Sequence, residues 1–183
     1  MTRGGMWMVL ALAAHHAVAA DAPVHFDRAR AAFTAKKYQE ALAEYDAVLE
    51  LQGEDGAVRH NRALVYLAMN DPIRAGEEAR RAVALAPKAG RYRITLAVAL
   101  LALDPPGLQE ATAALTAAEK LLKRARDREG LATTYYNLGY IAQRNREYVA
   151  ARRYFSLALR YDPDDDKSRE ALSALGAAGG DGE

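Results

Sequence analysis

One pattern of small and bulky side chains recurs along the chain, and it limits the fold more than any other feature of the sequence. The pattern is found in residues 37–45, 71–79 and 147–155. Ala75 stands 34 residues after the matching Ala41, and 76 residues before the matching Ala151. Because 76 residues are two periods of 34 with eight inserted, a further, less regular unit lies between them. A period of this length is typical of a solenoid in which each unit is a pair of helices.

The small residues of the pattern predict where the two helices of a pair touch. They are Ala29, Ala63, Ala97 and Gly139 in the first helix of each unit, and Ala41, Ala75, Ala111 and Ala151 in the second. Side chains of this size let two helix backbones approach closely. The bulky residues Tyr45, Leu115 and Phe155 are expected to fill the space toward the next pair. Each pair therefore buries its apolar face only against its neighbours.

The last unit carries the fullest set of positions of a known repeat. Its matching residues are Tyr135, Leu138, Gly139, Tyr148, Ala151, Phe155, Ala158 and Pro163. On these residues the chain resembles the tetratricopeptide repeat, over roughly residues 22–163. The resemblance implies an all-α fold, a right-handed α-solenoid of antiparallel helix pairs with about four units and a C-terminal capping helix. In the second unit, Arg59 stands where the family has a large aromatic residue.

The same resemblance gives the expected domain organisation. The repeat domain spans residues 21–176, with repeats at about 22–55, 56–89, 90–131 and 132–165, a capping helix at 164–175 and a flexible tail at 177–183. The third unit contains the helix-breaking turn Asp104-Pro105-Pro106-Gly107. Its second helix is expected to be long and to run to Arg126, because no glycine or proline interrupts it.

Residues 1–20 have the order of a secretory signal peptide. Arg3 precedes a nine-residue apolar run, and small residues follow it. The run is far shorter than the roughly 20 residues that span a bilayer, and small residues are what signal peptidase requires. We therefore expect cleavage after Ala19 or Ala20, a periplasmic or cell-envelope location, and no stable membrane insertion afterwards. An uncleaved anchor or an unstructured N-terminus is the alternative, favoured by the single positive charge.

The composition excludes several classes of function. Without cysteine, the chain has no disulfide, thiol nucleophile, Cys-ligated zinc site or iron–sulfur cluster. Its 25 basic and 24 acidic residues give a formal net charge of +1, which predicts no steering toward nucleic acid or an anionic membrane. The basic run at residues 120–128 is interrupted by Asp127 and contains no aromatic residue for base stacking, so it is interpreted as a solvated helix face.

No motif predicts catalysis, a metal or a cofactor. The sequence has no nucleophile elbow, phosphate loop, dinucleotide fingerprint or His-Glu-x-x-His string. After residue 20 only His25 and His60 remain, in separate units, so no histidine metal site is expected. The aspartates of residues 162–166 resemble the start of a calcium loop, but Lys167 stands where that loop needs its turn glycine. An enzyme with dispersed catalytic residues is the alternative.

The resemblance implies that function lies in a concave groove lined by the first helices of the pairs. The family positions that line it hold Phe26, Arg30, His60, Asn61, Leu64, Arg91, Ile94, Val98, Tyr136, Asn137 and Tyr140. Only Asn61 and Arg91 match the residues with which some members grip the C-terminal carboxylate of chaperones, so no carboxylate clamp is expected. The mixture suits an apolar or amphipathic peptide, with Tyr136, Tyr140 and Arg91 as anchors. The alternative is that these side chains pack against the third unit's long helix or the N-terminus.

Together these observations predict a non-catalytic adaptor or assembly scaffold of the cell envelope. Its partner is expected to be a protein or peptide, held in the groove, and not a nucleic acid. A self-assembling structural scaffold, in which copies form a homo-oligomer by stacking through the incompletely matched first repeat, is the alternative.

Overall fold

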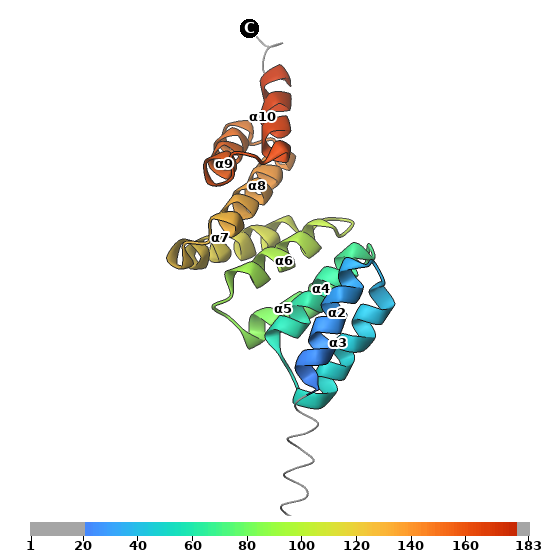
Figure 1. The fold of residues 1–183 in the computed structure, drawn as a ribbon. Helices are drawn as coiled ribbons and strands as arrows, with labels where there is room; N and C mark the ends of the chain where they lie inside the picture. Colours follow the sequence, from blue (N-terminus) through green and yellow to red (C-terminus); the bar gives the residue numbers. More distant parts are fainter. Residues whose placement is uncertain (1–20, 179–183) are drawn as a thin grey trace, which may run out of the picture. The chain divides into compact units, whose positions relative to one another are not determined.

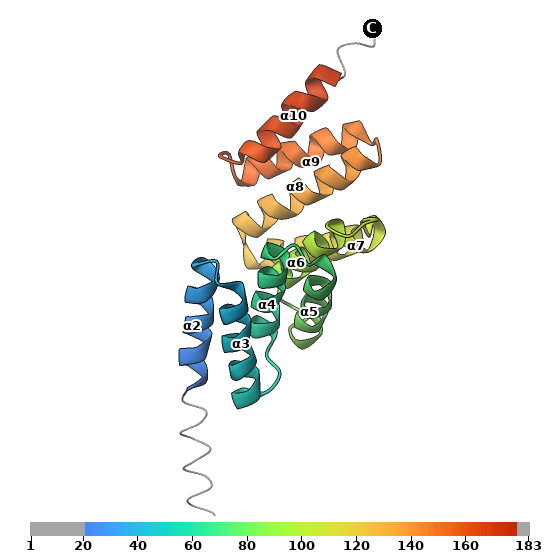
Figure 2. The ribbon, with the colours of Figure 1, turned by 90° about the vertical axis from the view of Figure 1, so that its right-hand side faces the viewer.

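The computed structural model describes residues 21–178, and the side chains of residues 21–176. Within these residues the chain folds into α-helices, with no strand (Figures 1 and 2). The all-α fold expected from the sequence is confirmed. The signal peptide expected at residues 1–20, and residues 179–183 of the expected tail, lie outside the described part of the chain.

The helices form two compact units, the first ending at Leu85 and the second beginning at Ala86. The first contains α2 (Ala22–Thr34), α3 (Tyr38–Gln52), α4 (Gly56–Ala68) and α5 (Pro72–Leu85). The second contains α6 (Gly90–Leu101), α7 (Leu108–Ala125), α8 (Arg128–Arg144), α9 (Tyr148–Tyr161) and α10 (Asp166–Ala178). Successive helices pack as antiparallel pairs, α2 with α3, α4 with α5, α6 with α7 and α8 with α9 (Figure 1). In the second unit α10 packs on α9 and continues through residues 177–178 of the segment expected to be a tail.

The turn inside a helix pair has the same backbone conformation in three of the pairs. Lys36, Asn70 and Arg146 each follow the first helix of a pair, with φ of 61°, 58° and 63°. This left-handed conformation ends an α-helix and turns the chain away from the helix axis. Between α6 and α7 no residue adopts it, and the turn there contains Pro105 and Pro106 instead. The third pair is thus the irregular one, and its second helix, α7, has 18 residues.

Two aspartates determine where α4 and α8 begin. A side-chain oxygen of Asp55 accepts hydrogen bonds from the backbone N–H groups of Ala57 and Val58, at 2.8 and 2.9 Å. Asp127 accepts one from the N–H of Gly130, at 3.0 Å. N–H groups in the first turn have no acceptor within the helix. The aspartates therefore supply hydrogen bonds that these groups would otherwise lack in the folded chain.

Methyl groups line the contact between paired helices. The small residues predicted for this place have an exposed fraction of 0% at Ala29, Ala63, Ala97, Ala41, Ala75, Ala111 and Ala151. In α8 the place is taken by Gly139, where an added Cβ would lie 2.7 Å from the ring of Phe155. The bulky residues Tyr45, Leu115 and Phe155 are at most 1% exposed. The small residues are thus buried in every pair, as predicted, and the Phe155 ring packs against Gly139 of its own pair rather than only toward the next one.

A stack of tyrosine rings fills the space between α8 and α9. The ring of Tyr135 is stacked between those of Tyr154 and Tyr161, with centroids 6.4 and 5.6 Å away. Its hydroxyl donates a hydrogen bond to Glu119 of α7, at 2.8 Å. The Arg128 guanidinium lies 5.7 Å from the centroid of the Tyr161 ring. Tyr135 therefore packs in the core, as its repeat position predicts, and joins α8 to both neighbouring helices.

We expect Gly139→Ala to reduce the free energy of unfolding by about 1–2 kcal/mol, because overpacking the buried Phe155 outweighs the better helix propensity of alanine. Chemical denaturation followed by circular dichroism measures the change. Gly176→Ala in α10 is the matched control, since no atom lies within 4 Å of its added Cβ. Equal stability of the Gly139 variant and the parent protein would contradict the close packing of α8 on α9.

Candidate functional site

The residues predicted to line a groove all lie on the first helices of the pairs, in two sets. In the first unit they are Phe26 and Arg30 on α2 and His60, Asn61 and Leu64 on α4. In the second unit they are Arg91, Ile94 and Val98 on α6 and Tyr136, Asn137 and Tyr140 on α8. The two helices that carry the second set, α6 and α8, contact each other.

Several of these side chains serve the fold itself. Ile94 and Asn137 are buried, each with an exposed fraction of 8%. The side-chain amide of Asn137 donates to the carbonyl of Thr133 at 2.8 Å, and that of Asn61 donates to the carbonyl of Ala57 at 2.9 Å. The ring of Phe26 packs edge-on against Tyr45. These contacts are within the residues' own helices or, for Phe26, with α3, so they do not test the alternative of packing against the third unit's long helix or the N-terminus.

Arg91, predicted as an anchor, is held by carboxylates of this chain. Its guanidinium donates two hydrogen bonds to Asp127, at 2.6 and 2.8 Å, and one to Glu129, at 2.9 Å. These bonds raise the pKa of Arg91, and the bond from Arg91 lowers the pKa of the Asp127 carboxyl below its ordinary 3.8. A partner would have to exchange these contacts before it could bind Arg91.

Tyr136 and Tyr140 are half-buried on α8 and keep part of their rings accessible. The ring of Tyr136 lies against Phe155, with centroids 5.9 Å apart. Burial raises the pKa of the Tyr136 hydroxyl, and the carboxylates of Asp165 and Glu170 add to this effect. The hydroxyl of Tyr140 accepts a hydrogen bond from the Arg144 guanidinium at 2.9 Å. We call Tyr136, Tyr140 and Arg144 the α8 face.

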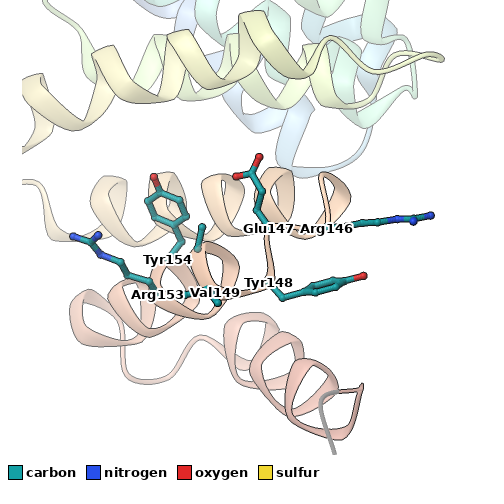
Figure 3. Close-up of a pocket in the computed structure, with 7 residues that line it drawn as sticks. Arg146, Glu147, Tyr148, Val149, Arg153 and Tyr154 are labelled. Atoms are coloured by element: carbon teal, nitrogen blue, oxygen red, sulfur yellow. The ribbon is translucent and has the colours of Figure 1, made fainter. Parts of the chain in front are cut away.

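A second apolar surface lies at the start of α9, around a hollow of about 620 Å³ (Figure 3). Tyr148 is 52% exposed and Val149 is 87% exposed, and as sequence neighbours they form a contiguous apolar patch. The lining of this α9 hollow is Arg146, Glu147, Tyr148, Val149, Ala150, Arg153 and Tyr154. Aromatic and aliphatic groups flanked by arginines are the composition found at the centre of protein interfaces.

The α9 hollow was not predicted from the sequence. Tyr148 was predicted only as a member of the repeat pattern, and Val149 was given no role. The available signal was that two apolar residues stand next to each other at a helix start. Neighbouring residues on a helix point about 100° apart, so both cannot face the same helix partner.

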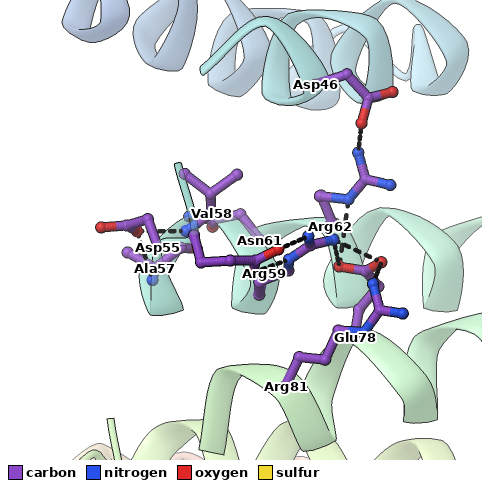
Figure 4. A network of polar contacts seen from close by, with 10 residues as sticks. Asp46, Asp55, Ala57, Val58, Arg59, Asn61, Arg62, Glu78 and Arg81 are labelled. Atoms are coloured by element: carbon purple, nitrogen blue, oxygen red, sulfur yellow. Dashed lines mark hydrogen bonds and ion pairs between the residues drawn. The ribbon is translucent and has the colours of Figure 1, made fainter. Parts of the chain in front are cut away.

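A cluster of ionisable side chains in the first unit explains the arginine found at an aromatic position (Figure 4). Arg59 donates two hydrogen bonds to Glu78 of α5, at 3.1 and 3.0 Å, and Arg62 donates one at 3.3 Å. The three side chains are buried. Arg59 also binds Glu54, and Arg62 binds Asp46. Hydrogen bonds to Glu54 and then to Glu78 raise the pKa of Arg59. This arginine joins α4 to α5 by charge where the family uses a ring.

Neither unit shows a metal centre or a membrane-crossing helix in its described residues. No group of three or more histidine, cysteine, aspartate or glutamate side chains is placed to hold a metal ion there. Among the same residues, no helix combines the length and the hydropathy needed to cross a bilayer. His25 is hydrogen-bonded to Glu44, with Nδ1 2.6 Å from the carboxylate.

Residues 132–165 match the model of the tetratricopeptide repeat family. The fold is similar to that of several solved structures. YrrB, described as a TPR protein with an unusual peptide-binding site, has a TM-score of 0.68 and 20% identity over 83% of this chain and 74% of its own. PilF of Pseudomonas aeruginosa has a TM-score of 0.76 and 18% identity over 87% and 69%. MamA has a TM-score of 0.71 and 18% identity over 87% and 82%. No curated protein sequence matches the chain significantly.

At these identities the solved structures show a shared fold alone. The predicted solenoid of helix pairs is confirmed by this shared fold, and the last pair, α8 with α9, is a tetratricopeptide repeat by sequence as well.

We expect Glu78→Gln to reduce the free energy of unfolding by about 3 kcal/mol, because it leaves two buried guanidinium groups without their shared carboxylate. Thermal and urea denaturation measure the loss. Glu54→Gln is the matched control and should cost less, since the Glu54 side chain is 57% exposed and its loss leaves Arg59 hydrogen-bonded to Glu78. Equal losses in the two variants would show that Glu78 is not the central acid of the cluster.

Asp127→Asn is expected to cost about 1 kcal/mol at pH 7, because asparagine can cap α8 but cannot form a charged pair with Arg91. The folded-state pKa of Asp127 lies below its unfolded value of 3.8. Its contribution is therefore complete above that pH and is lost as the pH falls further. Denaturation curves between pH 7 and pH 2.5 should converge for the two proteins at the acid end, and a difference that stays constant would exclude this linkage.

Proposed function

We propose that this chain, which carries a tetratricopeptide repeat at residues 132–165, is a non-catalytic adaptor or assembly scaffold that binds a segment of a partner protein. The fold stacks helix pairs and supports extended surfaces rather than an enclosed active site. Ion pairs such as Arg59 with Glu78 and Arg91 with Asp127 join one helix to another, so these ionisable groups serve the fold.

The α9 hollow is the observation that carries this proposal. Tyr148 and Val149 contribute little to the core, since most of their surface remains in contact with water. Covering them with an apolar side chain of a partner would remove that surface from water, which is favourable. Arg146 and Arg153 lie at the edge of the hollow, where they can donate hydrogen bonds to the backbone carbonyls or acidic groups of the same segment.

The α8 face remains a second proposed contact surface for an apolar or amphipathic peptide. Tyr136 and Tyr140 keep their predicted role there. Arg144 replaces Arg91 as the proposed cation, because Arg91 is held by two carboxylates whereas Arg144 donates a hydrogen bond to the Tyr140 hydroxyl. The similarity of the fold to YrrB, whose peptide-binding site is described as unusual, supports peptide binding as a function of this architecture.

We also propose that the protein works in the cell envelope after export. The support is the order of charge, apolar run and small residues in residues 1–20. Without these residues the chain has 24 basic and 24 acidic residues and a formal net charge of zero.

Capture in the source organism tests the proposed function. The full chain with a C-terminal affinity tag would be cross-linked in cells, purified, and its partners quantified by mass spectrometry. Two variants alter one surface each: Tyr148→Ser with Val149→Ser for the α9 hollow, and Tyr136→Ala with Tyr140→Ala for the α8 face. Ile73→Ser is the matched control, because Ile73 holds the repeat position of Val149 in α5 and is 66% exposed.

We expect an envelope protein that is captured by the parent and by the Ile73 variant but lost from the α9 variant. If the partner is lost from the α8 variant alone, the binding surface is the α8 face in the predicted groove and not the α9 hollow. Capture of only the protein's own copies, together with a size in light scattering that grows with concentration, would favour the self-assembling scaffold. The same partners in every variant would overturn both surface assignments.

A further inference from the structure

Three cations surround a hollow of about 560 Å³ in the second unit, apart from both surfaces described above. They are Arg93 of α6 and Lys120 and Arg124 of α7. The rest of the lining is Pro87, Ala113, Thr116, Ala117 and Leu121, so no acidic residue takes part. We call this the cationic hollow.

The spacing of the α7 residues explains how the hollow combines charge with an apolar floor. Ala113, Ala117 and Leu121 are four residues apart and form one row along the helix. Lys120 and Arg124 are also four apart and form the neighbouring row. A ligand lying along α7 would therefore meet apolar surface on one side and positive charge on the other.

The cations of the hollow have few acidic neighbours in this chain, although Lys120 lies near enough to Glu119 to help lower the pKa of that carboxyl. In the described residues, none of the three forms an ion pair. Arg93 donates one hydrogen bond to the carbonyl of Pro87 at 3.1 Å, and its buried Nε has no acceptor among those residues. Two other members of the same basic run, Lys123 and Arg128, are held by groups of this chain. Lys123 is paired with Glu119 at 2.6 Å, and Arg128 donates to two carbonyls at the end of α9.

We propose that the cationic hollow binds an acidic amphipathic segment of a partner protein. Its carboxylates would pair with Arg93, Lys120 and Arg124, and an apolar side chain between them would cover Ala117 and Leu121. This interaction goes beyond the proposed function, because it assigns a separate surface and requires negative charge, which the α9 hollow does not.

The residues that line the cationic hollow favour an acidic protein segment over a nucleic acid as its ligand. No aromatic side chain lines the hollow, so a nucleotide base would have no ring to stack on. The methyl and isobutyl groups of the floor offer no hydrogen bond to a base edge or a sugar, but they match an aliphatic side chain. Thr116 supplies the one side-chain hydroxyl of the lining.

Fluorescence anisotropy tests the proposal with a synthetic helical peptide that carries glutamates along one face and leucines beside them. The same peptide with glutamine in place of glutamate, and a single-stranded oligonucleotide of 20 thymidines, are the comparison probes. The full chain would be compared with the variant Lys120→Gln, Arg124→Gln. Arg28→Gln with Lys167→Gln is the matched control, since it removes two exposed cations elsewhere. The exchange Lys120→Arg, Arg124→Lys keeps both charges.

The glutamate peptide should bind the parent, the control and the charge-preserving variant alike, and bind the Lys120→Gln, Arg124→Gln variant about tenfold more weakly. Replacing glutamate by glutamine in the peptide should weaken binding to a similar degree. The proposal is overturned if the glutamate peptide does not bind at millimolar concentration. It is likewise overturned if this peptide binds the Lys120→Gln, Arg124→Gln variant as tightly as the Arg28→Gln, Lys167→Gln control. It is also overturned if the oligonucleotide binds more tightly and shows the same sensitivity, because the hollow would then be a phosphate site. Since the α9 hollow is unaltered in every variant, these outcomes are independent of the capture experiment.

Discussion

The close approach of two helix backbones within each pair is the constraint on which the rest of the structure depends. Seven alanines with no exposed surface, together with Gly139, line this contact. Because the paired helices approach closely at this contact, neighbouring helices can enclose bulky side chains such as those of Tyr45 and Phe155. A larger side chain at the contact would separate the helices and expose those rings. A second constraint is the turn between paired helices. In three of the pairs a residue in the left-handed conformation ends the first helix, so that the second helix can run antiparallel to it.

Much of the fold was predictable because its contacts repeat along the sequence. The 34-residue spacing in the sequence alone predicts the paired helices, the small residues between them and the irregular third pair. Arg59 marks a limit of that reasoning. Its sequence position showed only that an aromatic residue was missing, because Glu78, which compensates for it, lies 19 residues away on the neighbouring helix. A substitution whose partner is distant in sequence cannot be interpreted from its own position.

The candidate surfaces were harder to predict for the same physical reason. Family positions located α8 correctly as a helix with accessible tyrosines, but they could not show that Arg91 is held by Asp127, 36 residues away. The cations of the run at residues 120–128 looked alike in the sequence, and only the structure separates Lys123, which is paired, from Lys120 and Arg124, which are not. Which charges remain available at the surface of this chain therefore depends on contacts between residues far apart in the sequence.

The methyl-lined contact also has a consequence for the entropy of folding. Alanine and glycine have no side-chain rotamers to lose, so the closest helix contacts form without the ordering cost that leucine or methionine would bring. The loss of side-chain rotamer freedom is concentrated in a few large residues, such as Tyr135, which contacts Tyr154, Tyr161 and Glu119. The outward-facing positions carry almost none of it. Their side chains can therefore be exchanged in evolution with little effect on folding, which leaves the partner of such a chain free to change while its helices stay as they are.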